Sequence, residues 1–175
     1  MPIDESLSFI PVRIAVLTVS DTRGPTDDKS GDILVERLTG DGHILADRAI
    51  CRDSTDEIVS RLHGWALRDD VDCVITTGGT GVTGRDVTPE ALHRLDGKDI
   101  PGFGELFRWI SFGKIGTSTI QSRACAVVAN CTYIFALPCS TGAVKDGWDE
   151  ILRLQLDSRH KPCNFVELMP RLNER

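Results

Sequence analysis

Short apolar runs rich in β-branched residues alternate with helical patterns along this chain, and this alternation limits the folds open to it. Five runs are predicted as strands: Arg13–Ser20, His43–Ile50, Val71–Thr77, Ala124–Asn130 and Thr132–Leu137. Only Cys131 separates the last two, so they form either one strand or two. Because strands that alternate with helices favour parallel pairing, the sequence predicts an α/β fold. Its expected form is three-layered, with a mostly parallel sheet and helices on both faces.

The segments between these runs carry helical patterns and start signals. Helices are predicted over Ser30–Leu38, after Ser54, from Thr88, over Glu105–Phe112 and over Lys145–Leu156. Ser54 and Glu57 form a capping box, in which Glu57 is expected to reach back to the cap. Thr88 is predicted to cap the next helix, with Pro89 in its first turn. Gly97–Gly104 is predicted to be a turn region.

The length and composition suit one globular domain. The 175 residues contain no repeat, linker or low-complexity tract, so we expect a single domain over 1–175 with an ordered core at about 11–165. No window approaches the roughly 18 apolar residues of a membrane span, and the acidic N-terminus lacks a signal-peptide pattern. We therefore expect a cytoplasmic protein with no membrane partner.

Charge, cysteine and histidine patterns narrow the function further. The formal net charge of −6 argues against a nucleic-acid partner, although it allows a small anionic ligand at a locally favourable site. The six cysteines form no C-x-x-C pair, and in a reducing cytosol they are expected to remain free. The four histidines are scattered, so no dedicated zinc site is expected.

The sequence TTGGTGVTGRDVTPE, residues 76–90, is the strongest functional signal. It directly follows a predicted buried strand, and ligands of open α/β sheets bind beyond the carboxyl ends of the strands. Its glycines permit left-handed backbone, which lets successive amides point into one concavity and hold an anion. Its threonines add hydroxyl donors. A phosphate group suits this chemistry, and Asp86 lies near enough to share the pocket.

This glycine loop (residues 78–87) is open to four interpretations. A Walker-type loop requires a lysine that is absent here. Gly79, Gly81 and Gly84 spell the dinucleotide triplet G-x-G-x-x-G, but residues 86–89 intervene before the helix and no strand ending in an acid follows. A third possibility is a turn whose glycines only reverse the chain. The fourth is a phosphate loop with an adjacent carboxylate that orients a metal or a substrate.

Several motifs together resemble the MoaB/MogA family of molybdenum cofactor biosynthesis proteins, and the MoaB branch in particular. They are TGGTG at 77–81 with RDVTPE at 85–90, LTVSD at 17–21, KSG at 29–31, PGFGE at 101–105, GTSTIQSRA at 116–124, LPCSTGAV at 137–144 and LDSRHKPCNF at 156–165. The resemblance implies a molybdopterin-binding domain. Enzymatic members use Mg²⁺ and ATP to adenylylate molybdopterin, which makes this protein a candidate nucleotidyltransferase. The alternatives are a non-catalytic molybdopterin carrier and an unrelated nucleotide-binding protein.

The resemblance also implies particular site residues. Asp86 and Asp53 are the candidate catalytic acids, with Asp86 as the candidate Mg²⁺ ligand. The candidate substrate- and phosphate-binding residues are Thr77, Gly78, Gly79, Thr80, Gly81, Arg85, Pro89, Glu90, Ser20, Asp21, Ser122, Arg123, Pro138, Ser140 and Thr141. Each has a plainer explanation: a loop or capping acid for Asp86 and Asp53, solvated or intersubunit charges for the two arginines, and a helix cap for Ser140.

Two further features bear on ligand and partners. Cys139 stands where the family commonly has glycine, which would strain the chain if that position required a positive φ. The apolar stretch Phe103–Phe112 is consistent with either a core helix or a contact between subunits. The resemblance implies a homotrimer or homohexamer that works alongside other molybdenum cofactor biosynthesis proteins.

Overall fold

The computed structural model describes residues 3–174 and contains one six-stranded sheet. The strands are β1 (Arg13–Val19), β2 (Ile44–Cys51), β3 (Cys73–Thr77), β4 (Gly97–Asp99), β5 (Cys125–Ala129) and β6 (Thr132–Leu137), in the order β2-β1-β3-β6-β5-β4. The four strands β2, β1, β3 and β6 run parallel, whereas β5 is antiparallel to β6, and β4 is antiparallel to β5. The prediction of a mostly parallel sheet is confirmed.

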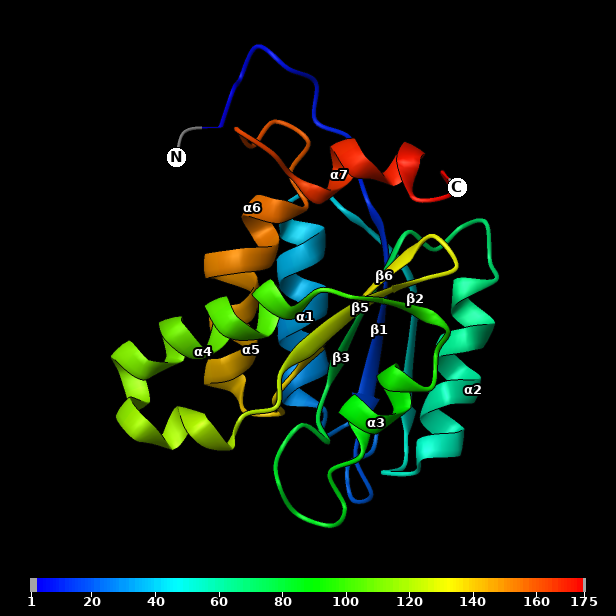
Figure 1. Ribbon diagram of the computed structural model, residues 1–175, viewed down its shortest axis with the longest axis vertical. Coiled ribbons are helices and arrows are strands. Elements are labelled where there is room, and N and C mark those ends of the chain that lie inside the picture. The colour runs from blue at the N-terminus through cyan, green and yellow to red at the C-terminus, as the bar shows by residue number, and fades with distance from the viewer. Residues whose placement is uncertain (1–2, 175) are drawn as a thin grey trace.

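Helices cover both faces of this sheet (Figure 1). They are α1 (Lys29–Gly40), α2 (Thr55–Ala66), α3 (Thr88–His93), α4 (Pro101–Ile115), α5 (Thr141–Gly147), α6 (Arg153–Gln155) and α7 (Phe165–Leu168). A 3₁₀ segment, Gly116–Gln121, follows α4, and a π-helical turn, Trp148–Leu152, joins α5 to α6. In Figure 1, α1, α4 and α5 lie on one side of the sheet, and α2 and α3 lie on the other, which gives the three expected layers.

Each face of the sheet has its own apolar core. On the α1–α4–α5 side, Leu34, Phe107 and Trp148 pack together with inward residues of the strands. On the other side, α2 contributes the stripe Ile58, Leu62, Trp65 and Ala66, all less than 9% exposed. This stripe has the helical spacing expected from the sequence, so the sheet is sealed on both faces and its functional groups lie at the edges.

The predicted turn region, Gly97–Gly104, is corrected by the structure. Gly97–Asp99 forms the edge strand β4, and α4 already begins at Pro101. Every residue of β4 is exposed, so its sequence carries no apolar pattern that would predict a strand paired with β5. Within α4, Gly104 allows close packing, because a Cβ there would lie 2.3 Å from the carbonyl oxygen of Ala124.

Two capping predictions are also corrected. Thr88 is the first residue of α3 rather than its cap, and its hydroxyl donates to the carbonyl of Gly78 at 2.8 Å. The amide of Glu57 donates to Ser54 Oγ as expected. The Glu57 carboxylate, however, accepts from the amide of Arg52, so the box is not reciprocal. In both cases a nearby loop amide or carbonyl competes for the side chain.

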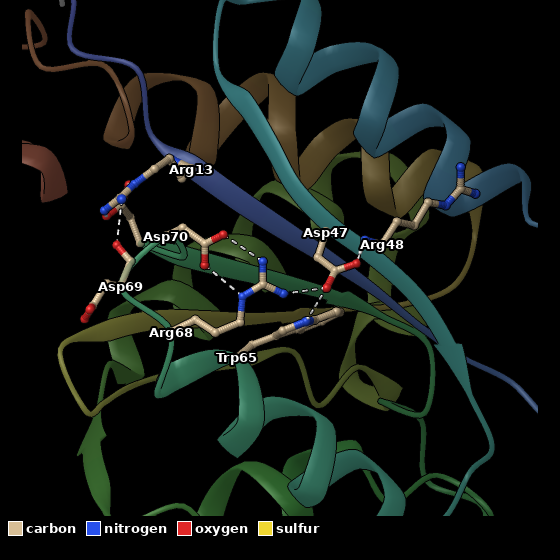
Figure 2. A network of polar contacts seen from close by, with 8 residues as sticks. Arg13, Asp47, Arg48, Trp65, Arg68, Asp69 and Asp70 are labelled. Carbon is tan, nitrogen blue, oxygen red and sulfur yellow. Dashed lines mark hydrogen bonds and ion pairs between the residues drawn. The ribbon is translucent and has the colours of Figure 1, made fainter.

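The end of the sheet opposite the glycine loop is held by ion pairs (Figure 2). Arg13, at the start of β1, binds the carboxylate of Asp72 through Nε at 2.8 Å. Arg68, beyond α2, bridges Asp70 and Asp47, and Asp47 also accepts from the indole of Trp65 at 2.9 Å. These residues tie β2 and β3 to α2 from the amino-terminal side, and none was predicted as a site residue.

Both terminal segments contact the rest of the described chain. Ile3 pairs with His160, and the amide of Asp4 donates to the carbonyl of Arg159 at 3.0 Å. Beyond residue 165, α7 packs Val166 into the core. Within residues 3–174, no helix is both long and apolar enough to cross a membrane.

Candidate functional site

The loops that carry the predicted site residues meet at one edge of the sheet. Ser20 and Asp21 follow β1, Asp53 follows β2, the glycine loop follows β3 and residues 138–141 follow β6. Since these strands are parallel, their carboxyl ends lie together, and Figure 1 shows the glycine loop at that edge. The residues Ser122 and Arg123 precede β5, which is antiparallel to β6, so they reach the same edge from the opposite direction.

The backbone of the glycine loop depends on two left-handed residues. Gly78 has φ +111° and Gly79 has φ +64°. The Gly78 amide donates to the Leu137 carbonyl at 3.0 Å and so continues the sheet, which leaves this amide engaged within the protein. The Gly81 amide lies close to the carboxylate of Asp86 and acts to lower the pKa of that group. No backbone hydrogen bond within residues 3–174 uses the amides of Gly79 and Thr80, so these two remain for an anion.

Three carboxylates lie around this loop, and we call Asp21, Asp53 and Asp86 the acidic rim. A Cβ added at Gly79 would lie 3.1 Å from Oδ1 of Asp53. Burial, followed by the nearby carboxylate of Asp21 and a smaller effect of Asp86, raises the pKa of Asp53. A carboxylate whose pKa is raised beside other acids favours a proton or a cation, which is typical of functional sites.

Asp86 is held in a different way. Its Oδ2 accepts from the amide and the hydroxyl of Thr83, at 2.9 Å and 2.6 Å. Partial burial acts to raise its pKa, but these bonds and the Gly81 amide outweigh burial, so the pKa of Asp86 is lowered. The carboxylate therefore remains ionised at neutral pH and holds the loop closed, which combines a loop-capping role with a fixed negative charge.

The acidic rim fits Mg²⁺ only in the way typical of nucleotide sites. Within the described residues, no group of three or more His, Cys, Asp or Glu side chains is placed to hold a metal. Mg²⁺ commonly takes one or two protein carboxylates, several waters and the phosphates of its substrate, and does not need a full protein cage. Asp53 and Asp86 are the residues of the acidic rim whose carboxylates would hold Mg²⁺ in this way, and the sequence predicts Asp86 as the ligand.

Both predicted phosphate-binding arginines are engaged within the protein. Arg85 pairs with the carboxylate of Asp21 across the loop. Arg123 pairs with Glu90 and also donates to two loop carbonyls. Neither guanidinium is presented as a free cation among the described residues, and a phosphate-binding role for either stays a prediction. Arg23, which sequence reasoning left in an unassigned loop, reaches the carbonyl of Cys139 at 3.3 Å and places a positive charge beside the loop after β6.

A cavity of about 210 Å³ lies beside the glycine loop and is lined mainly by uncharged groups. Its walls come from the loop, the end of α4, the 3₁₀ segment and the start of α5: Thr80, Gly81, Phe107, Ser111, Ile115, Ser118, Thr119, Gln121, Ser122, Pro138, Ser140 and Ala143. The hydroxyl of Thr80 is buried and has no hydrogen-bond partner among the described residues. An uncharged pocket that carries an unsatisfied hydroxyl suits a small heterocycle with hydrogen-bonding edges.

Other predicted residues serve the structure of this edge. The Ser20 hydroxyl accepts from the amides of Thr22 and Arg23, and Thr77 donates to the Pro138 carbonyl. Ser140 caps α5, and its Oγ accepts from the Ala143 amide at 3.2 Å, so it both caps the helix and lines the cavity.

Pro89 and Thr141 lie on helices rather than at the cavity. Thr141 is exposed in the first turn of α5, and Pro89 is buried in α3. Neither lines the cavity.

Cys139 does not strain the chain. It is absent from the residues with positive φ in the described part of the chain, so the substitution for glycine imposes no left-handed conformation here. Its side chain is exposed, and the cavity is lined by its neighbours Pro138 and Ser140.

Comparison with known proteins shows which family this chain belongs to. The profile of the family described as "Probable molybdopterin binding domain" matches residues 15–158. Molybdenum cofactor biosynthesis protein B of Escherichia coli K12 is 50% identical over 160 residues, which cover 91% of this chain and 94% of that protein. The protein of the same name from Staphylococcus carnosus is 44% identical, over 83% of this chain and 87% of its own length. The chain belongs to the MoaB/MogA family.

Solved MoaB structures have the same fold. A crystal structure of molybdenum cofactor biosynthesis protein B superimposes with a TM-score of 0.85 at 36% identity, over 97% of this chain and all of that one. MoaB from Pyrococcus furiosus, described as a tungsten cofactor synthesizing protein, gives 0.77 at 32% identity, over 94% and 98%. The resemblance inferred from the sequence motifs is therefore confirmed, and the family fold includes the edge at which the MoaB/MogA motifs gather.

Sequence reasoning missed several residues at this edge. Arg23 contacts the loop after β6, and the cavity is also lined by Phe107, Ser111, Ile115, Ser118, Thr119, Gln121 and Ala143. Ser118, Thr119 and Gln121 lie in the family motif GTSTIQSRA, in which only Ser122 and Arg123 are predicted site residues, whereas a lone arginine in a polar loop carries no signal of its own.

Proposed function

We propose that this protein adenylylates molybdopterin with Mg²⁺ and ATP. The observation that carries the proposal is the placement of the Asp53 carboxylate, with its raised pKa, next to Gly79 in a loop where the amides of Gly79 and Thr80 are available. The uncharged cavity on the other side of Thr80 supports a site with two compartments. One compartment would take phosphates, and the other would take the pterin ring.

In the proposed reaction, a terminal phosphate oxygen of molybdopterin attacks the α-phosphorus of ATP. The bond from that phosphorus to the bridging oxygen breaks, and pyrophosphate leaves with the electron pair. Bound Mg²⁺ would neutralise the phosphate charges that otherwise repel each other. Asp53 and Asp86 would hold the Mg²⁺ ion, and the amides of Gly79 and Thr80 would orient the phosphate oxygens. Such a mechanism needs positioning and charge compensation rather than a protein nucleophile.

A non-catalytic molybdopterin carrier is the second candidate. The observation that favours it is the pairing of Arg85 with Asp21 and of Arg123 with Glu90, because a transferase usually directs a cation at the transferring phosphoryl group. A carrier would need only the cavity and the two loop amides.

A product assay separates the two candidates. The protein is incubated with molybdopterin, ATP and Mg²⁺, and the pterins are separated by chromatography. Adenylylated product from the wild type is expected, with a decrease of about 100-fold or more in Asp86→Asn and Asp53→Asn. Asp56→Asn is the matched control, since Asp56 is an exposed acid of α2 that pairs with Arg94. Tight binding of molybdopterin without product in the wild type would instead support the carrier. Binding of NAD(H) without molybdopterin would contradict both candidates.

We also propose that the chain assembles as a homotrimer or homohexamer and works in the cytoplasm beside other molybdenum cofactor biosynthesis proteins. The helix α4 is apolar on two sides: Phe103 and Phe107 enter the core, while Trp109 and Phe112 are 75% and 56% exposed. Ile120, in the following 3₁₀ segment, is 81% exposed. Large exposed apolar side chains on neighbouring segments are typical of a subunit contact.

A further inference from the structure

Arg123 uses its backbone amide and two of its guanidinium nitrogens to bind carbonyl groups of the glycine loop. Its amide donates to the Thr80 carbonyl at 2.8 Å, and its Nε donates to the Gly81 carbonyl at 2.6 Å. Its Nη2 donates to the carbonyl of Asp86 at 2.6 Å. The residue thus holds the loop at three points, before and after the exposed tip at Val82–Arg85.

The rest of the guanidinium is held by α3. Both terminal nitrogens of Arg123 bond the carboxylate of Glu90, and this pairing lowers the pKa of Glu90. The guanidinium is planar, so fixing one side on Glu90 fixes the direction of the donors that reach the loop. The helix α3 is itself joined to the loop, because the amide of Thr88 donates to the carbonyl of Gly79.

We infer that Arg123 is a positioning residue, which together with Glu90 holds the carbonyls of the glycine loop so that the amides of Gly79 and Thr80 face the ligand. The inference rests on the proposed function, in which those amides hold phosphate oxygens. Arg123 then acts through the loop rather than as a cation on the substrate. Two properties follow: lysine cannot replace it, and the effects of changing Arg123 and Glu90 are coupled.

The first arm of the test needs no ligand. Hydrogen exchange is measured by NMR at the bonded amides of Thr83, Asp86 and Thr88 in the wild type, Arg123→Lys and Glu90→Gln. Exchange is expected to rise about tenfold or more in both variants, because the carbonyls on either side of the loop tip lose their fixed donors. Arg94→Lys is the control, since this exposed arginine follows α3 and pairs with Asp56 outside the loop. Loop exchange unchanged from the wild type in Arg123→Lys overturns the inference.

The second arm measures molybdopterin affinity in the same proteins and in the double variant. Each single variant is expected to weaken binding by about tenfold. The double variant is expected to bind molybdopterin no more weakly than the single variant that has the lower affinity. Effects that multiply in the double variant, or an Arg123→Lys protein with wild-type affinity, overturn the inference. A wild type that binds no molybdopterin refutes the proposed function instead, and the exchange data still decide whether Arg123 holds the loop.

Discussion

The carbonyl oxygen of Val19 occupies the space that a side chain at Gly78 would need. A Cβ added at Gly78 would lie 2.1 Å from that oxygen, and φ at this residue is +111°. The end of β1 and the start of the glycine loop are therefore in direct contact, so any shift at one moves the other. Both the close approach and the backbone conformation require glycine at this position.

Gly78→Ala is expected to lower the free energy of unfolding by about 3 kcal/mol, because steric overlap and left-handed strain act together. Chemical denaturation measures the change. Gly84→Ala is the matched control in the same loop, since a Cβ there meets nothing within 4 Å and φ is not positive. Equal destabilisation by the two substitutions would contradict the proposed contact.

Thr80→Val is expected to separate stability from binding. The Thr80 hydroxyl is buried and unpartnered among the described residues, so replacing it with a methyl group should leave the thermal midpoint unchanged or raise it. If a ligand in the cavity satisfies that hydroxyl, molybdopterin affinity should fall by about tenfold. Calorimetry gives both quantities.

Thr76→Val provides the comparison for that prediction. Thr76 carries another buried hydroxyl without a partner within residues 3–174, but it lies within β3 and does not line the cavity. Its substitution should affect stability in the same direction and leave affinity alone. A loss of affinity in Thr76→Val equal to that in Thr80→Val would mean that the cavity is not the binding site.

Asp28 stabilises the start of α1 through a fully buried carboxylate. It accepts from the Thr18 hydroxyl at 2.7 Å, from Arg48 at 2.8 Å and from the Gly31 amide at 3.0 Å. Asp28→Asn is expected to lower the free energy of unfolding by about 3 kcal/mol, because it removes the charge of one partner of a buried ion pair. Asp32→Asn removes the more exposed partner of Arg48 and should cost less than about 1 kcal/mol.

The ionisation of Asp28 also sets a direction with pH. Burial acts to raise its pKa, but the bonds from Arg48, Thr18 and Gly31 outweigh burial and lower it below 3.8. A lowered pKa means that the stabilisation is complete above 3.8 and is lost as the pH falls through the folded-state value. The difference in stability between the wild type and Asp28→Asn should therefore shrink in acid, and a difference that grows there would refute this account.

The buried side chain of His43 leads us to expect a second effect of pH on stability, near neutrality. Its ring lies between Phe9 and Trp148, and Nδ1 accepts from the amide of Val12 at 3.2 Å. Burial lowers the pKa of His43 below 6.5, although Asp41 and Asp157 partly oppose the shift. The unfolded chain thus binds more protons, so stability is expected to fall as the pH drops through 6.5.

His43→Gln should flatten this pH dependence, because a glutamine carbonyl can accept from Val12 without titrating. The measurement is the thermal midpoint between pH 7.5 and 5.5 for the wild type and the variant. His63→Gln, at an exposed position of α2, should keep the wild-type slope. A His43→Gln protein with that same slope would exclude His43 as the titrating group.

Trp109→Glu is expected to dissociate the proposed oligomer, because a charge replaces the side chain of an apolar residue that is 75% exposed on α4. Sedimentation velocity measures the mass of the assembly. Leu67→Glu alters another exposed apolar residue, just beyond α2, and should leave that mass unchanged. A monomeric wild type would refute the proposed assembly directly.

Local sequence patterns were sufficient for the layers of the fold and for the position of the glycine loop. Apolar runs and the stripe from Ile58 to Ala66 depend on periodicity along a single segment, and this periodicity survives folding. The hairpin between β5 and β6 was left open, because it depends on Asn130 and Cys131 both adopting positive φ, which neither residue type demands.

What the sequence alone determined is which chemical groups follow each strand: the amides and hydroxyls after β3 and the acids after β1 and β2. Only the tertiary structure decided which of these groups remain available. The hairpin brings Arg123 beneath the glycine loop, Asp21 pairs with Arg85, and the Gly78 amide bonds a carbonyl of β6. The reason is physical: hydrogen bonds and ion pairs between segments far apart in the chain compete for the same donors, and their geometry exists only after folding.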